Sequence, residues 1–323
     1  MELESDEFAS DWHGSRASVS HDRATQRTGH QQLVRHQVAA KLRELQKTLF
    51  DLRAANASLG NVKLIGPSIR FEKSARLVGD MSAHVDYLNL DVYTGTSAPE
   101  GIYSDAGSDG SGHGSVKSAK AMHSIMGGDQ CLMVTEAGEH NDYQQTTGYR
   151  GTTEKISGRY IPRVYLELAR RGVCRTFIYE LVDERNAPTN VEANFGLLRN
   201  NLTEKPAFTA VKNMIALLTD TSGAASSFVA GQLNYTLSGS TNNVSQMLFQ
   251  KADGTFHLAL WLGKRTWHWK IRSEVAVAGQ LVTVNVATRK TSTIHRLDDA
   301  GIILEARRKR LLAVSSRSAC QIA

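Results

Sequence analysis

The stretch CLMVTEAGEH at residues 131–140 begins as an apolar run and changes abruptly at Thr135 and Glu136. Four consecutive apolar residues closed by polar and turn-forming residues are typical of a fully buried strand. A carboxylate is costly to bury unless it has a partner. We therefore expect Glu136 at the carboxyl end of a buried strand, where parallel α/β proteins place their functional side chains.

Strand-like and helix-like segments alternate around this stretch, from about residue 31 to 220. The strand patterns lie at 62–66, 85–93, 131–135 and 175–181. The helix patterns lie at 31–55, at 115–126, around 161–168 and after Pro206, and the first has Val38, Leu42, Leu45, Leu49 and Leu52 on one face. This alternation predicts βαβ units and a parallel sheet, which is an α/β fold. Asp91, Tyr93, Glu180 and Asp183 then fall at the same sheet edge as Glu136.

The pattern changes after residues 221–227, which are rich in Ser, Gly and Ala and are typical of a linker. Short alternating segments follow, with a hairpin signal at Ala252-Asp253-Gly254. They predict a small antiparallel β-sandwich-like domain over 228–305. Residues 306–323 are basic and Ser-rich, and we interpret them as a tail.

Composition excludes several classes of protein. The chain has 323 residues, of which 41% are hydrophobic and 22% charged, as expected of a globular protein. No segment approaches the ~20 apolar residues of a membrane span, and the acidic N-terminus is not a signal peptide. The run Arg307–Arg310 has no nucleic-acid-binding motif around it, so we expect a solvated tail and no nucleic-acid partner.

Three cysteines, Cys131, Cys174 and Cys320, have no spacing typical of a metal site or a disulfide framework. Cys131 and Cys174 lie beside apolar runs and are expected to pack as small hydrophobic residues. We predict no metal and no organic cofactor.

Four segments together resemble the cellulase-like retaining glycoside hydrolases, which are built on a (β/α)8 TIM barrel with catalytic glutamates on strands four and seven. VTEAGEHN at 134–141 resembles the nucleophile strand, and VDYLNLDVYTG at 85–95 resembles strand six. RTFIYELVDE at 175–184 is similar to strand eight, and residues 192–215 are similar to the closing segment. The resemblance covers about 31–220, and such enzymes often carry a small β-domain.

This resemblance implies that 62–66 is strand five and that strand four lies near the start of the chain, where Glu7 matches the catalytic acid/base. Strands one to three have no counterpart. Residues 1–220 would then form the C-terminal part of the barrel. Two residues depart from the family pattern: Asp91 replaces an expected His, and Asp6 replaces an Asn.

The implied activity is hydrolysis of O-glycosidic bonds with retention of configuration, which needs two carboxyl groups ~5–5.5 Å apart. Glu136 would be the nucleophile, with Tyr93 as a hydrogen-bond donor to it, and Glu7 the acid/base. The substrate would be an oligosaccharide or polysaccharide. The remaining candidate substrate contacts are Asp91, His140, Tyr143, Tyr179 and Glu180. Relatives of this kind are commonly extracellular, although the location of this chain stays unknown.

Structural explanations compete with these roles. Glu136 could pair with Arg150 or Arg163, and Tyr93 and Tyr179 could be core residues. A sheet that does not close leaves an unpaired edge, which favours self-association. The alternative function is therefore a non-catalytic carbohydrate-binding or interaction fragment.

Overall fold

The computed structural model describes residues 21–100, 116–145, 149–221, 228–286, 290–304, 308–311 and 318–322. These residues belong to two compact units. The first unit draws on 1–93, 112–137 and 171–178, and the second on 94–111, 138–170 and 179–323. Each unit is described separately below.

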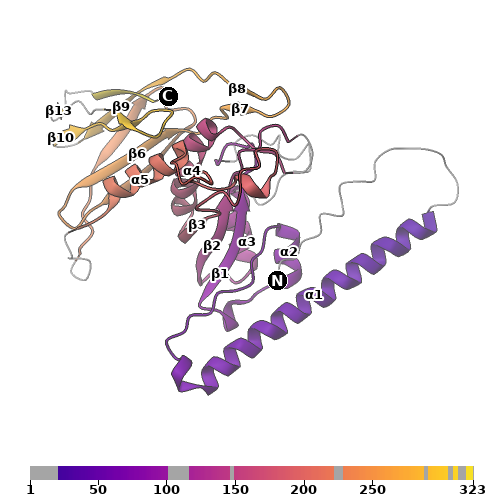
Figure 1. Cartoon of the computed structure of the whole chain (residues 1–323). Helices are drawn as coiled ribbons and strands as arrows, with labels where there is room; N and C mark the ends of the chain where they lie inside the picture. The colour runs from indigo at the N-terminus through magenta and orange to yellow at the C-terminus, as the bar shows by residue number, and fades with distance from the viewer. Residues whose placement is uncertain are drawn as a thin grey trace. The chain divides into compact units, whose positions relative to one another are not determined.

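The first unit is built on a three-stranded sheet in the order β1-β2-β3 (Figure 1). The strands are β1 (Tyr87–Tyr93), β2 (Cys131–Gly138) and β3 (Val173–Ile178), and β2 and β3 run parallel. Strands β1 and β2 are almost wholly buried, as strands of a parallel sheet usually are. Helix α3 (Val116–Ile125) contacts both β1 and α2 (Glu72–Val78). The predicted parallel α/β sheet is thus confirmed, and the described residues form no closed barrel.

The predicted strand at 62–66 is wrong as a regular strand. Only two isolated parallel bridges form in this region, Ile65 with Tyr87 and Ile69 with Leu90. Pro67 lies between them, and proline has no N–H to donate to a ladder. The segment therefore lies beside β1 without forming a continuous ladder of hydrogen bonds with it.

Helix α1 (His21–Ala55) begins ten residues before the expected start at residue 31. Its predicted leucine face is largely exposed, at 53% for Leu45, 41% for Leu49 and 57% for Leu52. The buried residues lie on the neighbouring face and include Ala39 and Gln46. Polar contacts explain why this neighbouring face, and not the leucine face, packs inward. Arg43 donates to two carbonyls of α2, and Gln46 donates to the His84 carbonyl at 3.2 Å.

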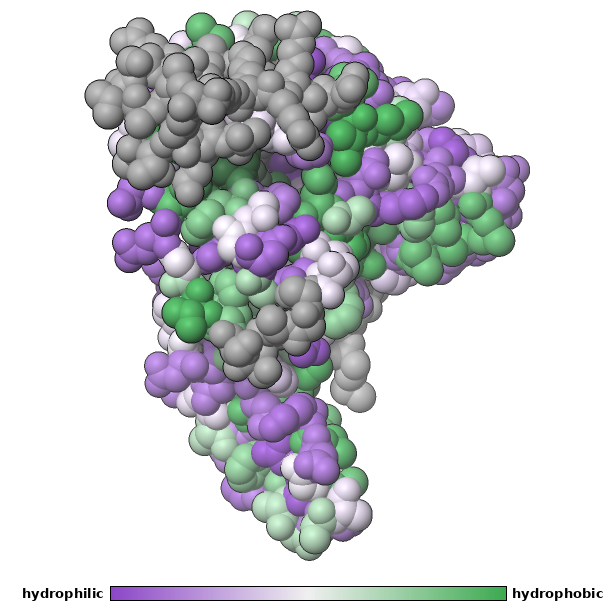
Figure 2. Space-filling model, turned by 90° about the vertical axis from the view of Figure 1, so that its left-hand side faces the viewer, coloured by the Kyte–Doolittle hydropathy of each residue, from purple (hydrophilic) through white to green (hydrophobic). Residues whose placement is uncertain are grey.

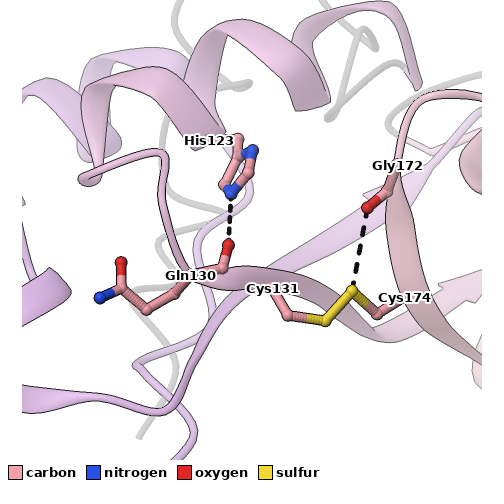
Figure 3. Close-up of a disulfide and its surroundings, with 5 residues drawn as sticks. All are labelled: His123, Gln130, Cys131, Gly172 and Cys174. Atoms are coloured by element: carbon pink, nitrogen blue, oxygen red, sulfur yellow. Dashed lines mark hydrogen bonds between the residues drawn. A yellow bond between two sulfur atoms is a disulfide. The ribbon is translucent and has the colours of Figure 1, made fainter.

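The expectation that Cys131 and Cys174 are unpaired is wrong. They form a disulfide between β2 and β3, with Cα atoms 6.1 Å apart (Figure 3). The sequence pattern missed it because the two cysteines are 43 residues apart and meet only when β2 and β3 pair. Next to it, the His123 ring lies 2.7 Å from the Gln130 carbonyl and connects α3 to the start of β2.

The second unit contains α4 (Glu154–Arg170) and α5 (Pro206–Leu218), which pack against each other. Both were expected, including Pro206 in the first turn, where its missing N–H costs little. Gly158 allows the close approach, since a Cβ there would lie 2.7 Å from the Pro206 ring. Ile156 and Tyr160 of α4 form a buried cluster with Trp267.

The strands of the second unit form small antiparallel sheets: β14-β9-β4, β5-β6, β7-β8, β10-β13 and β11-β12. The predicted hairpin at residues 252–254 is confirmed, because it joins β5 to β6. The segment predicted as a basic tail contributes two strands, β13 and β14. That these sheets form a sandwich stays a prediction, as does the division into domains at residue 220.

The bounds of the remaining elements are β4 (Tyr235–Gly239), β5 (Val244–Gln250), β6 (Phe256–Leu262), β7 (Trp267–His268), β8 (Ser273–Glu274), β9 (Gln280–Val286), β10 (Lys290–Thr293), β11 (Arg296–Leu297), β12 (Ile303–Leu304), β13 (Arg308–Leu311), β14 (Ser318–Ile322) and the 3₁₀ helices η2 (Ala57–Leu59), η3 (Ser82–His84) and η5 (Glu192–Asn194).

Among the described residues, no helix combines the length and the apolar character that a membrane crossing requires. On the face of the molecule in Figure 2, hydrophobic residues lie in several separate patches between hydrophilic ones.

Candidate functional site

The first unit carries a row of polar side chains on a strand that is otherwise apolar. Asn89, Asp91 and Tyr93 alternate along β1 with fully buried apolar residues, so the period of two places all three on one face of the sheet. Their exposed fractions are only 5%, 2% and 8%. A strand buries three polar side chains in succession only when each has partners.

Glu136 meets this row from the neighbouring strand. The Tyr93 hydroxyl donates a hydrogen bond of 2.7 Å to Glu136 Oε2. Glu136 is half-buried near the end of β2, and Tyr93 is the last residue of β1. The expected hydrogen bond between the two is therefore confirmed.

Thr135 connects the two strands below this contact. Its backbone N–H and its hydroxyl both donate to Asn89 Oδ1, at 3.2 and 2.9 Å. The same hydroxyl oxygen lies 3.4 Å from Asp91 Oδ1. Asn89 and Thr135 thus fix the register of the two strands that carry Tyr93 and Glu136.

Asp91 is the buried carboxyl of this group. Burial, and then the negative charge of Glu136, raise its pKa to about 6, while the Ser68 and Thr135 hydroxyls and the positive charge of Arg70 oppose the rise. The Arg70 guanidinium also lies over the Tyr93 ring, 5.4 Å from its centroid. Asp91, Glu136, Tyr93 and Arg70 are called the carboxylate cluster below.

Sequence reasoning did not identify Arg70 or Asn89. Asn89 left a signal, because it begins the alternation of polar residues that continues through Asp91 and Tyr93. No sequence signal pointed to Arg70, because it lies in an irregular segment after Pro67. The isolated bridge between Ile69 and Leu90 brings this segment next to β1.

Glu139, in the second unit, is a buried carboxyl that sequence reasoning also missed. The Thr94 hydroxyl donates to its Oε1 at 2.6 Å, and the Thr152 hydroxyl donates to Oε2 at 3.3 Å. Burial raises the pKa of Glu139 to about 8, although both hydroxyls and the charge of Arg163 oppose the rise. At neutral pH this side chain is therefore mostly protonated. Its position directly after Gly138 was the available signal.

Arg163, which was a candidate partner for Glu136, instead pairs with Glu100. Its Nε donates to Glu100 Oε1 at 2.7 Å, and the Trp261 indole donates to the same oxygen at 2.9 Å. Buried and bidentate, this pair anchors α4 within the second unit. Arg150, the other candidate, stacks on Trp269, with 3.5 Å between the guanidinium and the ring centroid.

Three predicted substrate contacts lie in different environments within the second unit. Tyr143 is 41% exposed and meets Trp267 edge to face. Tyr179 is half-buried against the Phe195 ring. His140 is fully buried beside Tyr149 and Phe195, and burial lowers its pKa to about 4, so the ring is neutral at physiological pH. Its predicted contact with a substrate stays a prediction.

Glu180 is half-buried, and its pKa is raised to about 7 by burial and then by Glu184, Asp183 and Glu192. Lys205 opposes this rise. Lys205 is itself buried and donates to Asp183 Oδ1 at 2.7 Å, which also accepts the Gly196 N–H. Asp183 is thus part of the packing of α5, whereas Glu180 remains able to exchange a proton near neutral pH.

Glu7, the predicted acid/base, lies outside the described residues. Within the described ranges, no group of three or more His, Cys, Asp or Glu residues is placed to hold a metal ion.

No family model matches the chain, and no curated protein matches it. The solved structures that it resembles include a glucosidase from Croceicoccus marinus (12% identity, 88% of this chain and 62% of that chain, TM-score 0.47). They also include a β-porphyranase of glycoside hydrolase family 86 from Bacteroides plebeius (10% identity, 89% and 51%, TM-score 0.41). A third is a family 39 glycoside hydrolase from Bacteroides cellulosilyticus (17% identity, 72% and 44%, TM-score 0.36).

The chain thus spans between 44% and 62% of the length of these three proteins. The three solved structures are a glucosidase and two glycoside hydrolases.

Proposed function

We propose that this protein hydrolyses O-glycosidic bonds by a retaining mechanism, with Glu136 as the nucleophile. The single observation that carries the proposal is the hydrogen bond of 2.7 Å from Tyr93 to Glu136 at the ends of neighbouring strands. A nucleophilic carboxylate must stay ionised, and a phenolic donor stabilises the ionised form. An oligosaccharide or polysaccharide would be the substrate.

The second carboxyl group of the mechanism is assigned to Glu7 from the family resemblance alone. It would protonate the leaving oxygen and later activate water. The candidate contacts to the sugar include Tyr143, Tyr179, Glu180 and His140, and Tyr143 is the more exposed of the two tyrosines.

Covalent trapping tests this proposal directly. A panel of 2-deoxy-2-fluoro glycosides with good leaving groups would be incubated with the full chain. Mass spectrometry of the intact protein and of its peptides follows. The expected result is one added glycosyl group on the peptide that contains Glu136, absent in the Glu136→Gln variant and present in the surface control Glu44→Gln. Labelling of another residue, or none with any sugar while the chain is folded, contradicts it.

A second candidate is an interaction fragment that is not catalytic. Strand β3 has β2 as its only strand neighbour among the described residues, and its Phe177 is 50% exposed. Both faces of a parallel sheet are normally covered by other elements. An open edge can pair with a strand of another chain. Self-association through β3 is therefore the alternative proposal. Sedimentation of the native chain and of Phe177→Lys would test it, with a concentration-dependent mass expected only in the native chain.

A further inference from the structure

The carboxylate cluster contains one acid that the proposed reaction does not use. Asp91 is only 2% exposed, and its predicted contact with a substrate stays a prediction. It lies on the same face of β1 as Tyr93, which donates to Glu136. A buried carboxyl beside a second carboxyl is a costly arrangement unless one of the two holds a proton.

The hydrogen bonds of Thr135 indicate which group holds that proton. A hydroxyl has one proton to donate, and that of Thr135 is directed to Asn89 Oδ1 at 2.9 Å. The same hydroxyl lies 3.4 Å from Asp91 Oδ1, so an ionised Asp91 competes with Asn89 for its single proton. A protonated Asp91 can instead donate to the Thr135 oxygen, which lets both contacts form at once. The Ser68 hydroxyl is a further polar neighbour of Asp91.

We propose that Asp91 is a positioning residue for Glu136: its protonated form completes the Thr135 bridge between β1 and β2 and leaves Glu136 as the single anion of the cluster. This inference rests on the proposed role of Glu136 as nucleophile. The charged and titratable groups that act on Asp91 are Glu136 from β2 and Arg70 from the segment before α2. Tyr93 completes the set through its bond to Glu136.

Loss of the Asp91 proton would change the site in two ways. The Thr135 bridge would lose a donor, and Glu136 would gain a like charge beside it. Burial and the neighbouring charge place this ionisation near pH 6, because the pKa of Asp91 is raised to about 6. If the chain is a hydrolase, its kcat should therefore decline as the pH rises through this value. Asp91→Asn should remove this part of the decline, whatever its absolute rate, and leave the part due to the acid/base.

The decisive experiment does not require activity. The side-chain carboxyl carbons of aspartate would be labelled with ¹³C, and their chemical shifts followed by NMR from pH 3 to 9 in the native chain. Asp91→Asn identifies the resonance. The expected result is a midpoint near 6 in the native chain and a lower midpoint, closer to that of an ordinary aspartate, in Glu136→Gln. The control Glu44→Gln, which removes an exposed charge on α1, should leave the midpoint unchanged.

An ordinary aspartate midpoint in the native chain, or the same midpoint in native and Glu136→Gln proteins, would overturn the inference. Should Glu136→Gln fail to fold, urea unfolding of the native chain and of Asp91→Asn between pH 4.5 and 7.5 replaces it. The stability difference between the two should then grow with pH in favour of the variant, and a constant difference would overturn the inference. If Asp91 and Glu136 titrate as a coupled pair but no glycosyl group is trapped, the proposed hydrolase activity is wrong and the charge coupling stands. If a glycosyl group is trapped on Glu136 but the titration is not coupled, the hydrolase proposal stands and the role of Asp91 is wrong.

Discussion

Asp91 and Glu139 are both buried carboxyls with raised pKa values, and their surroundings differ. Asp91, in the first unit, has a second carboxyl and a guanidinium acting on it, and its pKa is about 6. Glu139, in the second unit, accepts hydrogen bonds from the hydroxyls of Thr94 and Thr152, and its pKa is about 8. Both carboxyls have hydroxyl partners and a nearby arginine, but only Asp91 has a second carboxyl acting on it.

Asp91 and Glu139 illustrate how a candidate reactive group differs from a structural one. Burial keeps Glu139 mostly protonated at neutral pH, although the two hydroxyls that donate to it favour the ionised form. Asp91 titrates at lower pH, beside Glu136, which is half-buried. Perturbed carboxyls next to charged partners are the stronger functional candidates.

The largest expected effect separates Glu136 from Glu139. Glu136→Gln should lower kcat by about 10³-fold or more, because an amide cannot act as the nucleophile. Glu139→Gln should retain activity within about tenfold at pH 6, since an amide replaces a neutral acid of the same shape. Steady-state rates on an aryl glycoside that traps the native chain would measure both. Equal losses of activity in the two variants would contradict separate roles for Glu136 and Glu139.

Glu139 should next dominate the pH dependence of stability. Its folded pKa of about 8 exceeds the ordinary value of 4.5, so its contribution is full below pH 4.5 and is lost as pH rises through 8. The free energy of unfolding should fall by about 3–4 kcal/mol across this window in the native chain, at up to ~1.4 kcal/mol per pH unit. Urea unfolding of Glu139→Gln should lack this part of the fall and keep the smaller parts due to Asp91 and Glu180. A native chain whose stability is flat from pH 5 to 9 would contradict the prediction.

Asp91 should produce a smaller change at lower pH. Its folded pKa of about 6 exceeds the ordinary 3.8, so the native chain loses this contribution as pH rises from 3.8 through 6. We expect a loss of about 1–3 kcal/mol, absent in Asp91→Asn. The double variant with Glu139→Gln should lose both contributions and keep the one that Glu180 makes below pH 7. If one substitution removed both, the two carboxyls would not titrate independently.

Tyr93 should give the smallest effect. Tyr93→Phe removes one hydrogen bond to a carboxylate, which corresponds to about tenfold in kcat, or ~1.4 kcal/mol. Thermal unfolding should change little, because the ring still packs beneath Arg70. A loss as large as that of Glu136→Gln would give Tyr93 a direct role in the reaction.

The sequence predicted the strands around Glu136 and Tyr93 because their apolar runs and turn residues are local signals. It also predicted the hairpin at residues 252–254, whose Gly254 adopts a positive φ of 83°. It did not predict the disulfide, the exposed leucine face of α1 or the bridges around Pro67. Each of those depends on which distant segment packs against which.

Residue order is enough to predict a carboxylate near the end of one buried strand and a tyrosine at the end of its neighbour, because apolar runs and a period of two are local signals. Which carboxyls keep a proton depends on the packing of distant segments. Asp91 became a neighbour of Glu136 and Arg70, and Glu139 met two hydroxyls, only once chain segments separated by tens of residues had packed together. A pKa depends on burial and on charges in space, and neither can be read from residue order.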